Sequence, residues 1–438
     1  MSSFQSKGLK GYLLRGGIGS GLLKIFQAVL NILVAIVLAR GLGTDGYGFY
    51  TFVISLISIV SIPAQMGLPM LVVREVAHYQ LKNKLDFLRG ILRWAIRVSF
   101  TLSLFLILAG FLYFLAVREN LSDEEAGTIL WALPLICFLS LSKVRGAVLR
   151  GLRHVVQGQF PEMFFRPAVM LALSLGLLTY GSLTPSHAMA SYMISALLAF
   201  LLGSILLWRV LPTGIEKIQP VYERKEWLKS ILPLSLIAGM QVVNHQVDMV
   251  LLGILRSNDS VGVYKVATQM VTLVGFSLTI INSLIAPQIS RLYQSGEMRK
   301  LQNMITLCSR LMVATAFPVA MAFLFFGESI IGFVFGEEYG AGNVALLILS
   351  LGQVVNAAMG SVAYILNMTG HENDTAKGIV ISAISNVLLN LLLIPYFGIE
   401  GAALSTVVSL SLWNFMLYRQ AIRRTGINSL FIPFRLSK

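Results

Sequence analysis

The sequence predicts an all-α polytopic membrane protein with twelve transmembrane helices in two six-helix bundles. Of its 438 residues, 56% are hydrophobic and only 12% are charged, whereas a soluble domain is about a quarter charged. The apolar residues come in repeated blocks, and about twenty such residues span the ~30 Å hydrocarbon layer as a helix. The two halves of the chain also resemble each other. Composition and block length together exclude a soluble enzyme, a disordered chain, a collagen and a disulfide scaffold.

Twelve apolar blocks define the predicted spans. They lie near 17–39, 47–71, 95–117, 126–144, 160–182, 187–208, 228–254, 262–288, 305–327, 341–366, 376–396 and 398–421. Proline inside such a span is tolerated because neighbouring helices shield the freed backbone groups. The resulting division has these parts: an N-terminal segment (1–16), a first bundle (17–208), a linker (209–227), a second bundle (228–421) and a C-terminal tail (422–438).

The distribution of basic residues predicts the orientation. With the N-terminus inside, most of the 34 Lys and Arg residues fall in cytoplasmic loops, and the outer loops hold only Arg40, Arg118 and Arg256. Cytoplasmic loops carry such an excess, so we expect a cytoplasmic-membrane protein with both termini inside. The same rule accounts for the net charge of +14 without a nucleic-acid partner. Every outer loop is short, which argues against a catalytic domain on the outer face.

The halves of the chain align at an offset of 214 residues. Gly48-Phe49-Tyr50 then coincides with Gly262-Val263-Tyr264, and Asp45 coincides with Asp259. Each half holds six predicted spans, an even number, so the halves share one orientation and are related by an axis along the membrane normal. Transporters built this way expose a central site to alternate faces by rocking one bundle against the other.

Two of the predicted spans carry polar stripes. The first span presents Lys24, Gln27 and Asn31 on one helical face, and the seventh presents Gln241, Asn244, His245 and Asp248. A charge at the bilayer centre costs at least about 2.5–3.5 kcal/mol on insertion scales. Neither stripe should therefore face lipid, and we expect both to line a cleft between the bundles.

Each polar residue also has a structural interpretation. Buried Gln and Asn can join helices by hydrogen bonds, and Lys24 can extend to the membrane surface. Asp248 is a candidate for coupling to H⁺ or Na⁺ together with His245, and the alternative is an ion pair with a cation on another helix. Glu162 and Arg166, four residues apart, can pair on one helix, although Arg166 remains a candidate for the cavity.

No catalytic, metal or cofactor site is predicted. The chain has two cysteines, Cys137 and Cys308, both in apolar stretches, so a disulfide or a cysteine metal site is not expected. Asn386 and Asn390, one turn apart, are interpreted as packing contacts. The first apolar block is too long for a cleavable signal and is expected to be retained.

Several short stretches resemble polysaccharide-biosynthesis flippases, the O-antigen (lipopolysaccharide) repeat-unit exporters of the multidrug/oligosaccharidyl-lipid/polysaccharide superfamily. One stretch is Leu38-Ala39-Arg40-Gly41-Leu42-Gly43, with Gly46-Tyr47-Gly48-Phe49-Tyr50, Gly67-Leu68 and Arg74. A second is Asp248-Met249-Val250-Leu251-Leu252-Gly253, and a third contains Asn386, Asn390, Pro395, Gly398 and Gly401-Ala402-Ala403. The resemblance spans most of the chain and implies a MATE-like fold.

The resemblance also implies a function: moving a polyprenyl-diphosphate-linked oligosaccharide from the cytoplasmic to the outer leaflet for cell-surface polysaccharide synthesis. A cationic cleft could hold the diphosphate while the polyprenyl tail stays in lipid. Lys24 and Arg166 are then candidates for the anion contact. Gln27, Asn31, Gln241 and Asn244 are candidates for sugar contacts. Implied partners are the lipid-linked glycan, membrane lipids, H⁺ or Na⁺, and a glycan polymerase.

Two other functions compete with the flippase. A MATE-type cation-coupled drug antiporter of the same superfamily would favour acidic residues over Lys24 in the first half of the chain. An integral-membrane glycan-assembly enzyme would need a sizeable outer loop, which is missing, and a non-transporting scaffold would leave the two polar stripes unexplained.

Overall fold

The computed structural model describes the backbone of residues 2–432 and the side chains of residues 19–231 and 233–432. The described residues form helices and no strand. Contacts divide the chain into two compact units: unit 1 contains Met1–Leu42 and Phe52–Val242, and unit 2 contains Gly43–Thr51 and Val243–Lys438. Some predicted cytoplasmic cations, namely Lys7, Lys10, Arg15, Arg435 and Lys438, lie outside the described side chains.

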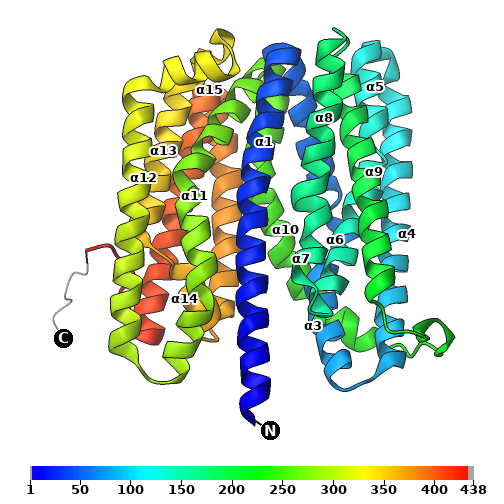
Figure 1. Ribbon diagram of the computed structural model, residues 1–438. Coiled ribbons are helices and arrows are strands. Elements are labelled where there is room, and N and C mark those ends of the chain that lie inside the picture. Colours follow the sequence, from blue (N-terminus) through cyan, green and yellow to red (C-terminus); the bar gives the residue numbers. More distant parts are fainter. Residues whose placement is uncertain (1, 433–438) are drawn as a thin grey trace. The chain divides into compact units, whose positions relative to one another are not determined.

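Unit 1 is organised around α6. Its helices are α1 (Ser2–Val60, apart from the segment in unit 2), α2 (Ile62–Gln65), α3 (Leu68–Leu81), α4 (Leu85–Val117), η1 (Arg118–Asn120), α5 (Asp123–Ala132), α6 (Leu135–Gly151), α7 (Val155–Phe160), the π-helix η2 (Pro161–Phe165), α8 (Arg166–Thr179), α9 (Pro185–Val210), η3 (Ile215–Lys217) and the start of α10 (Arg224–Leu255). Helix α6 packs against α3, α4, α7 and α9 (Figure 1). Because α6 lies at the centre of the unit, a charged residue on it must find its partners inside the protein.

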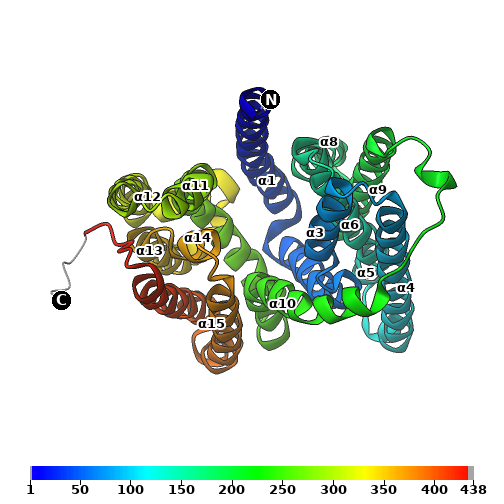
Figure 2. The ribbon, with the colours of Figure 1, turned by 90° about the horizontal axis from the view of Figure 1, so that it is seen from below.

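Unit 2 has an equivalent centre in α13. Its elements are the end of α10, α11 (Asn258–Gln294), α12 (Met298–Phe335), η4 (Glu337–Gly342), α13 (Asn343–Met359), α14 (Val362–Met368) and α15 (Glu372–Thr425). Helix α13 packs against α11, α12 and α15, and α14 lies between α11 and α15 and packs against both (Figure 2). The central helices of the two units are the fourth and tenth predicted spans, which the sequence repeat equates.

Nine helices of the described chain are long and apolar enough to cross a membrane. Two of them cover residues of two predicted spans. Gly19–Val60 covers the first predicted span from residue 19 and the second as far as residue 60, with non-helical backbone at Gly43. Glu372–Thr425 contains the last two predicted spans, with non-helical backbone at Gly398. The prediction of an all-α multi-pass membrane protein is confirmed. Helix α10 is not among the nine, so the number of twelve spans stays a prediction.

Two segments that the repeat equates pack against each other within unit 2. A side chain at Gly48 would collide with the carbonyl oxygen of Asn258, and one at Gly262 would collide with that of Thr44. The Thr44 hydroxyl also donates a hydrogen bond to Asp259, at 2.5 Å. Glycine is therefore required at both equivalent positions, because the two backbones approach with no room for a Cβ atom.

The linker after α9 is fastened to unit 1. The Tyr79 hydroxyl donates to the Glu223 carboxylate at 2.7 Å and accepts from the indole nitrogen of Trp227 at 3.1 Å. Burial, and then the bond to Glu223, raises the pKa of Tyr79 far above its usual value. Trp227 is buried and packs against Trp94, with ring centroids 5.1 Å apart. The predicted linker thus makes these contacts in unit 1, and residues 228–242 of α10, which the sequence assigns to the second bundle, belong to unit 1 as well.

Candidate functional site

A π-helical turn in unit 1 positions two of the charged residues. Pro161 is the first residue of this turn and Pro167 follows its end, and both lack a backbone N–H, so each removes one i→i−4 hydrogen bond. The N–H of Arg166 instead bonds to the carbonyl of Pro161, five residues earlier. Single π turns occur frequently at functional sites. Here the turn contains Glu162, and Arg166 follows directly after its last residue, Phe165.

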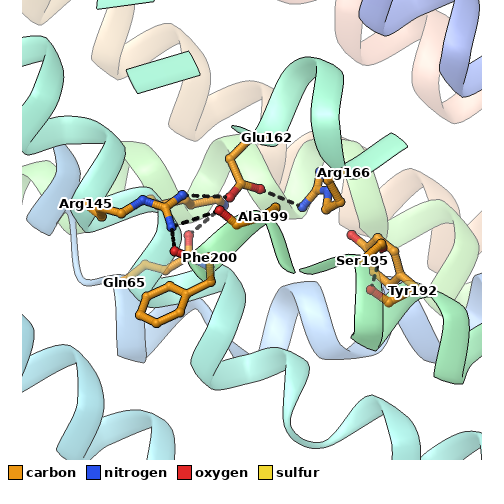
Figure 3. Close-up of polar contacts among 9 residues, drawn as sticks. Gln65, Arg145, Glu162, Arg166, Tyr192, Ser195, Ala199 and Phe200 are labelled. Atoms are coloured by element: carbon orange, nitrogen blue, oxygen red, sulfur yellow. Dashed lines mark hydrogen bonds and ion pairs between the residues drawn. The ribbon is translucent and has the colours of Figure 1, made fainter. Parts of the chain in front are cut away.

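Arg145, on the central helix α6, anchors Glu162 (Figure 3). Its side chain is only 5% exposed and lies 3.2 Å from a Glu162 carboxylate oxygen. It also donates to the carbonyls of Ala199 and Phe200 on α9, at 3.2 and 2.5 Å. A glycine on α9, Gly203, leaves room for the guanidinium, because a Cβ atom there would overlap it. Arg145 is therefore held by α9 and holds Glu162 in turn.

Arg166 shares the same carboxylate from the other side. Its guanidinium lies 3.0 Å from the second oxygen of Glu162, which confirms the predicted pairing on one helix. It also lies over the Tyr192 ring, 5.5 Å from the centroid, and the side chain is 21% exposed. Arg145 and Arg166 thus bracket one acid (Figure 3), and only Arg166 keeps a substantial exposed part.

A third cation, Lys143, extends this group. Its ammonium donates to the Gln65 side-chain oxygen at 2.8 Å. Gln65 ends α2, just before the two left-handed residues Met66 and Gly67 that separate α2 from α3. We call Lys143, Arg145, Glu162 and Arg166 the unit 1 cluster. Three cations and one acid leave it with a net positive charge, which favours an anionic ligand.

The first polar stripe lies on α1, in unit 1. Lys24 and Gln27 are partly exposed, and Asn31 is exposed. None of the three forms a hydrogen bond or an ion pair with another described residue. Their side chains are therefore not fixed as interhelical contacts within the described part of unit 1, and they remain candidates for contact with a ligand.

The second stripe, on α10, is divided between the units. Gln241 belongs to unit 1, whereas Asn244, His245 and Asp248 belong to unit 2. Gln241 and His245 are exposed and Asn244 is partly exposed. Only Asp248 is buried, and it contacts the interior of its own unit, so the four residues do not share one environment.

Asp248 is the centre of a polar site in unit 2. The side chain is 7% exposed and accepts hydrogen bonds from Tyr264 on α11 at 3.0 Å, and from Asn390 and Thr406 on α15 at 2.7 and 2.5 Å. Asn386 lies within hydrogen-bonding reach of the same carboxylate. Within the described residues no cation pairs with Asp248, so the alternative of an ion pair on another helix is not seen.

Two further oxygens around Asp248 have no partner. The side-chain oxygens of Asn386 and Asn390 are buried and accept no hydrogen bond from any described group, and both residues are at most 2% exposed. A buried acceptor without a donor is costly. The carboxylate, the Thr406 hydroxyl and two amides with unpartnered oxygens thus belong to one hydrogen-bonded group, and oxygen atoms are the ligands that a hard cation prefers. We call Asp248, Asn386, Asn390 and Thr406 the unit 2 site.

Sequence reasoning missed several of these residues. Lys143 and Arg145, at and just after the end of the predicted span 126–144, are not among the candidate residues of the sequence analysis, which interprets Asn386 and Asn390 as packing contacts. One signal was present, since the resemblance stretches contain Asp248, Asn386 and Asn390 together. No local pattern marked Thr406, because its role depends on how α15 packs against α10. The described residues contain no group of three or more His, Cys, Asp or Glu residues able to hold a metal.

Comparison with known proteins agrees with these observations. The chain matches the family described as "Polysaccharide biosynthesis protein" over residues 13–293 and the MatE family over residues 233–395. It is similar to the probable low-salt glycan biosynthesis flippase Agl15 of Haloferax volcanii, with 25% identity over 91% of this chain and 81% of that protein. The probable flippase AglR of the same organism is 24% identical over 90% of this chain and 80% of that protein.

Two solved structures share the fold. An inward-facing multidrug resistance MATE transporter has a TM-score of 0.73 and 14% identity, covering 91% of this chain and 94% of that one. The lipid II flippase MurJ in an inward closed conformation has a TM-score of 0.72 and 14% identity, covering 92% and 87%. At this identity the likeness shows the fold alone. The chain therefore belongs to the polysaccharide biosynthesis protein family and is an all-α polytopic membrane protein with a MATE-like fold.

Proposed function

We propose that the protein is a flippase that moves a polyprenyl-diphosphate-linked oligosaccharide across the cytoplasmic membrane by alternating access. The observation that carries this proposal is the net positive unit 1 cluster on membrane-spanning helices. Family membership and the names of the curated relatives support it. In this proposal both termini are cytoplasmic, and the flippase delivers its glycan to a polymerase.

The unit 1 cluster fits the charged part of such a substrate. A diphosphate crosses hydrocarbon only at a large free-energy cost, so it needs cations along its path. Arg166 is suited to this role because a guanidinium binds phosphate oxygens in bidentate fashion, and because it is more exposed than Arg145. Glu162 holds Arg166 in the empty state, and a phosphate replaces Glu162 as its partner. Lys24 is the second proposed anion contact.

The remaining stripe residues fit the polar part of the glycan. Gln27, Asn31, Gln241 and Asn244 carry amides that can both donate to and accept from sugar hydroxyls. All four are exposed or partly exposed. We assign them to glycan contacts rather than to the diphosphate, because they carry no charge.

The unit 2 site fits a coupling ion. The atoms of this site that can coordinate a cation are all oxygens, and two of them have no hydrogen-bond partner among the described residues. The site carries a single negative charge, so Na⁺ suits it better than a divalent ion. The alternative is a proton on Asp248, with His245 as a second acceptor. His245 is exposed, and its ring makes no hydrogen bond to another described residue. We therefore assign the ion to Asp248 first and to His245 second.

Reconstitution tests the transport proposal directly. Purified protein in vesicles, given a fluorescent polyprenyl-diphosphate oligosaccharide in one leaflet, should move it to the other leaflet. Arg166→Gln and Lys24→Gln should slow this movement, and Arg118→Gln, in an exposed ion pair with Asp123, is the matched control. Wild-type protein that fails to move the lipid-linked glycan, although it is folded and correctly inserted, would contradict the proposal.

Imposed gradients test the coupling. Flipping is measured in vesicles with a Na⁺ gradient and in vesicles with a pH gradient. Only one of the two gradients should accelerate flipping, and Asp248→Asn should remove that acceleration. Glu400→Gln, at a partly exposed acid of the same unit, is the control. Full gradient-dependent flipping by Asp248→Asn would exclude the coupling role.

A second candidate function is a MATE-type cation-coupled drug antiporter. The match to the MatE family over residues 233–395 favours it. An antiporter for cationic drugs would confer drug resistance on a sensitive host. If the protein did this while vesicles moved no lipid-linked glycan, the antiporter would replace the flippase.

A further inference from the structure

Residues 427–432, which follow the last long helix, do not leave unit 2 as a free tail. Helix α15 ends at Thr425, and Gly426 adopts a left-handed conformation that reverses the chain. After this turn Ile427 and Ser429 are 1% and 0% exposed. Residues 427–432 are therefore packed inside or along the unit, although the sequence predicts a cytoplasmic tail from residue 422 onward. We call residues 427–432 the strap.

The strap binds to an interruption between two helices. Helix α13 ends at Met359, and Gly360, with φ of 72°, separates it from α14. The break leaves carbonyls without helical partners, and the strap supplies two donors. The backbone N–H of Phe431 bonds to the carbonyl of Ala358 at 3.2 Å, and the Ser429 hydroxyl bonds to that of Met359 at 2.7 Å. Unpaired backbone groups inside a membrane are costly. The strap therefore supplies hydrogen-bond donors for the carbonyl groups at this break.

The other side of the strap follows α12. The Gln302 side chain pairs with the backbone of Asn428, accepting from its N–H at 2.8 Å and donating to its carbonyl at 2.6 Å. Ser309 donates to the carbonyl of Ser429 at 2.7 Å, and Arg310 donates to that of Phe431 at 3.2 Å. Successive strap residues thus meet successively later positions of α12, so the strap climbs along this helix.

The contacts with α12 show how far the strap extends along this helix from its first residue. Helix α12 begins at Met298, one residue after Glu297, which forms an exposed ion pair with Lys300. At 1.5 Å per residue, Arg310 lies about 18 Å along the helix from Met298. It also lies within the predicted span 305–327. Figure 1 shows the described end of the tail leaving unit 2 well above the lower end of α12.

We infer that the strap enters the membrane along α12 and that its apolar end binds phospholipid at the headgroup–acyl boundary of the inner leaflet. Three consecutive apolar residues, Leu430, Phe431 and Ile432, end it, and Ile432 is 54% exposed. Arg310, an exposed cation on a membrane helix, bonds to the strap and reaches the headgroups from there. The strap therefore fastens α12 to α13 and α14 and anchors this corner of unit 2 in the leaflet. This inference does not depend on the transported substrate.

Site-specific fluorescence tests the location. In a background with Cys137→Ser and Cys308→Ala, a bimane label is placed at Ile432→Cys or, as the control, at Arg423→Cys. Arg423 is exposed in the last turn of α15. Brominated phospholipid should quench the label at residue 432 several-fold more than the label at residue 423, and aqueous iodide should show the reverse order. Equal access of iodide to both labels would overturn the inference.

Stability tests the role of the strap in closing the break. A chain ending at Gly426 should melt several degrees below a chain ending at Ile432, which should match the full-length protein. Ser429→Ala, which removes the bond to Met359, should give a smaller shift in the same direction. Ser295→Ala, at an exposed turn, is its control. If the shortened chain does not accumulate, Ser429→Ala decides the question, and a melting temperature equal to that of Ser295→Ala would contradict the closing role.

Discussion

The two units share an arrangement of helices, but they stabilise buried charge in different ways. In unit 1, Arg145 and Arg166 bracket the acid Glu162, so the charge is balanced by formal opposite charges. In unit 2, Asp248 is surrounded by neutral donors, among them Tyr264 and Asn390. The charge of Glu162 is already neutralised by its two arginine partners, whereas the Asp248 carboxylate has only neutral neighbours among the described residues and can still bind a cation. Under the proposed function the two units therefore have different roles: unit 1 binds the anionic substrate and unit 2 binds the coupling ion.

The largest expected effect concerns the stability of unit 1. Arg145→Met removes the buried partner of Glu162 and leaves the carbonyls of Ala199 and Phe200 without this donor. Breaking a buried ion pair from one side costs about 3–5 kcal/mol, so the unfolding free energy of the purified protein should fall by this amount in a denaturant titration. Arg118→Met, at an exposed pair worth about 0–1 kcal/mol, is the control. Equal losses would show that Arg145 is not an anchor.

The second prediction concerns the ion at unit 2. If Na⁺ binds only the folded protein, raising its concentration to a hundred times the dissociation constant should stabilise the protein by about 2.7 kcal/mol. Melting curves in NaCl and in choline chloride measure this difference. Asp248→Asn should abolish it, and Thr406→Val should weaken it while retaining part of the response. A Na⁺ response that persists in Asp248→Asn would move the ion to another site.

The third prediction concerns the affinity of unit 1 for substrate. Arg166→Lys keeps the charge but loses the bidentate geometry, and Arg and Lys are not interchangeable at such sites. Loss of one charged hydrogen bond of about 1.5 kcal/mol corresponds to roughly a tenfold higher KM for flipping. Flux measured against substrate concentration gives this value. An unchanged KM in both Arg166→Lys and Arg166→Gln would remove Arg166 from the anion site.

The smallest expected effect concerns the linker on unit 1. Tyr79→Phe removes the hydroxyl that joins Glu223 to Trp227, which should lower the unfolding free energy by about 1 kcal/mol. The pKa of Tyr79 is raised in the folded protein. Its contribution is therefore complete below the unfolded pKa of about 10 and is lost as the pH rises toward the folded value. At neutral pH the melting temperature of Tyr79→Phe should lie below that of wild type, and above pH 10 the two should converge. A difference that is the same at both pH values would contradict this.

The sequence by itself determined the protein class, the fold class and the family. Long apolar blocks require helices in a bilayer, since only helices satisfy their own backbone groups there, and the repeat offset paired Gly48 with Gly262. It also identified Asp248 and Arg166 as polar residues that lipid does not tolerate. The protein class, the fold class and the repeat follow from composition and local spacing, which do not depend on packing, whereas the family follows from the resemblance of a few short motifs.

Only the tertiary structure decided which residues surround these charges. Arg145 meets Glu162 because α6 packs against α9 and the π-turn redirects the acid, and Thr406 meets Asp248 because α15 packs against α10. The strap is the clearest case, because its partners Gln302 and Met359 are far from it in the chain. Polar partners are set by helix packing over long sequence separations, and the periodicity of one helix carries no record of its neighbours.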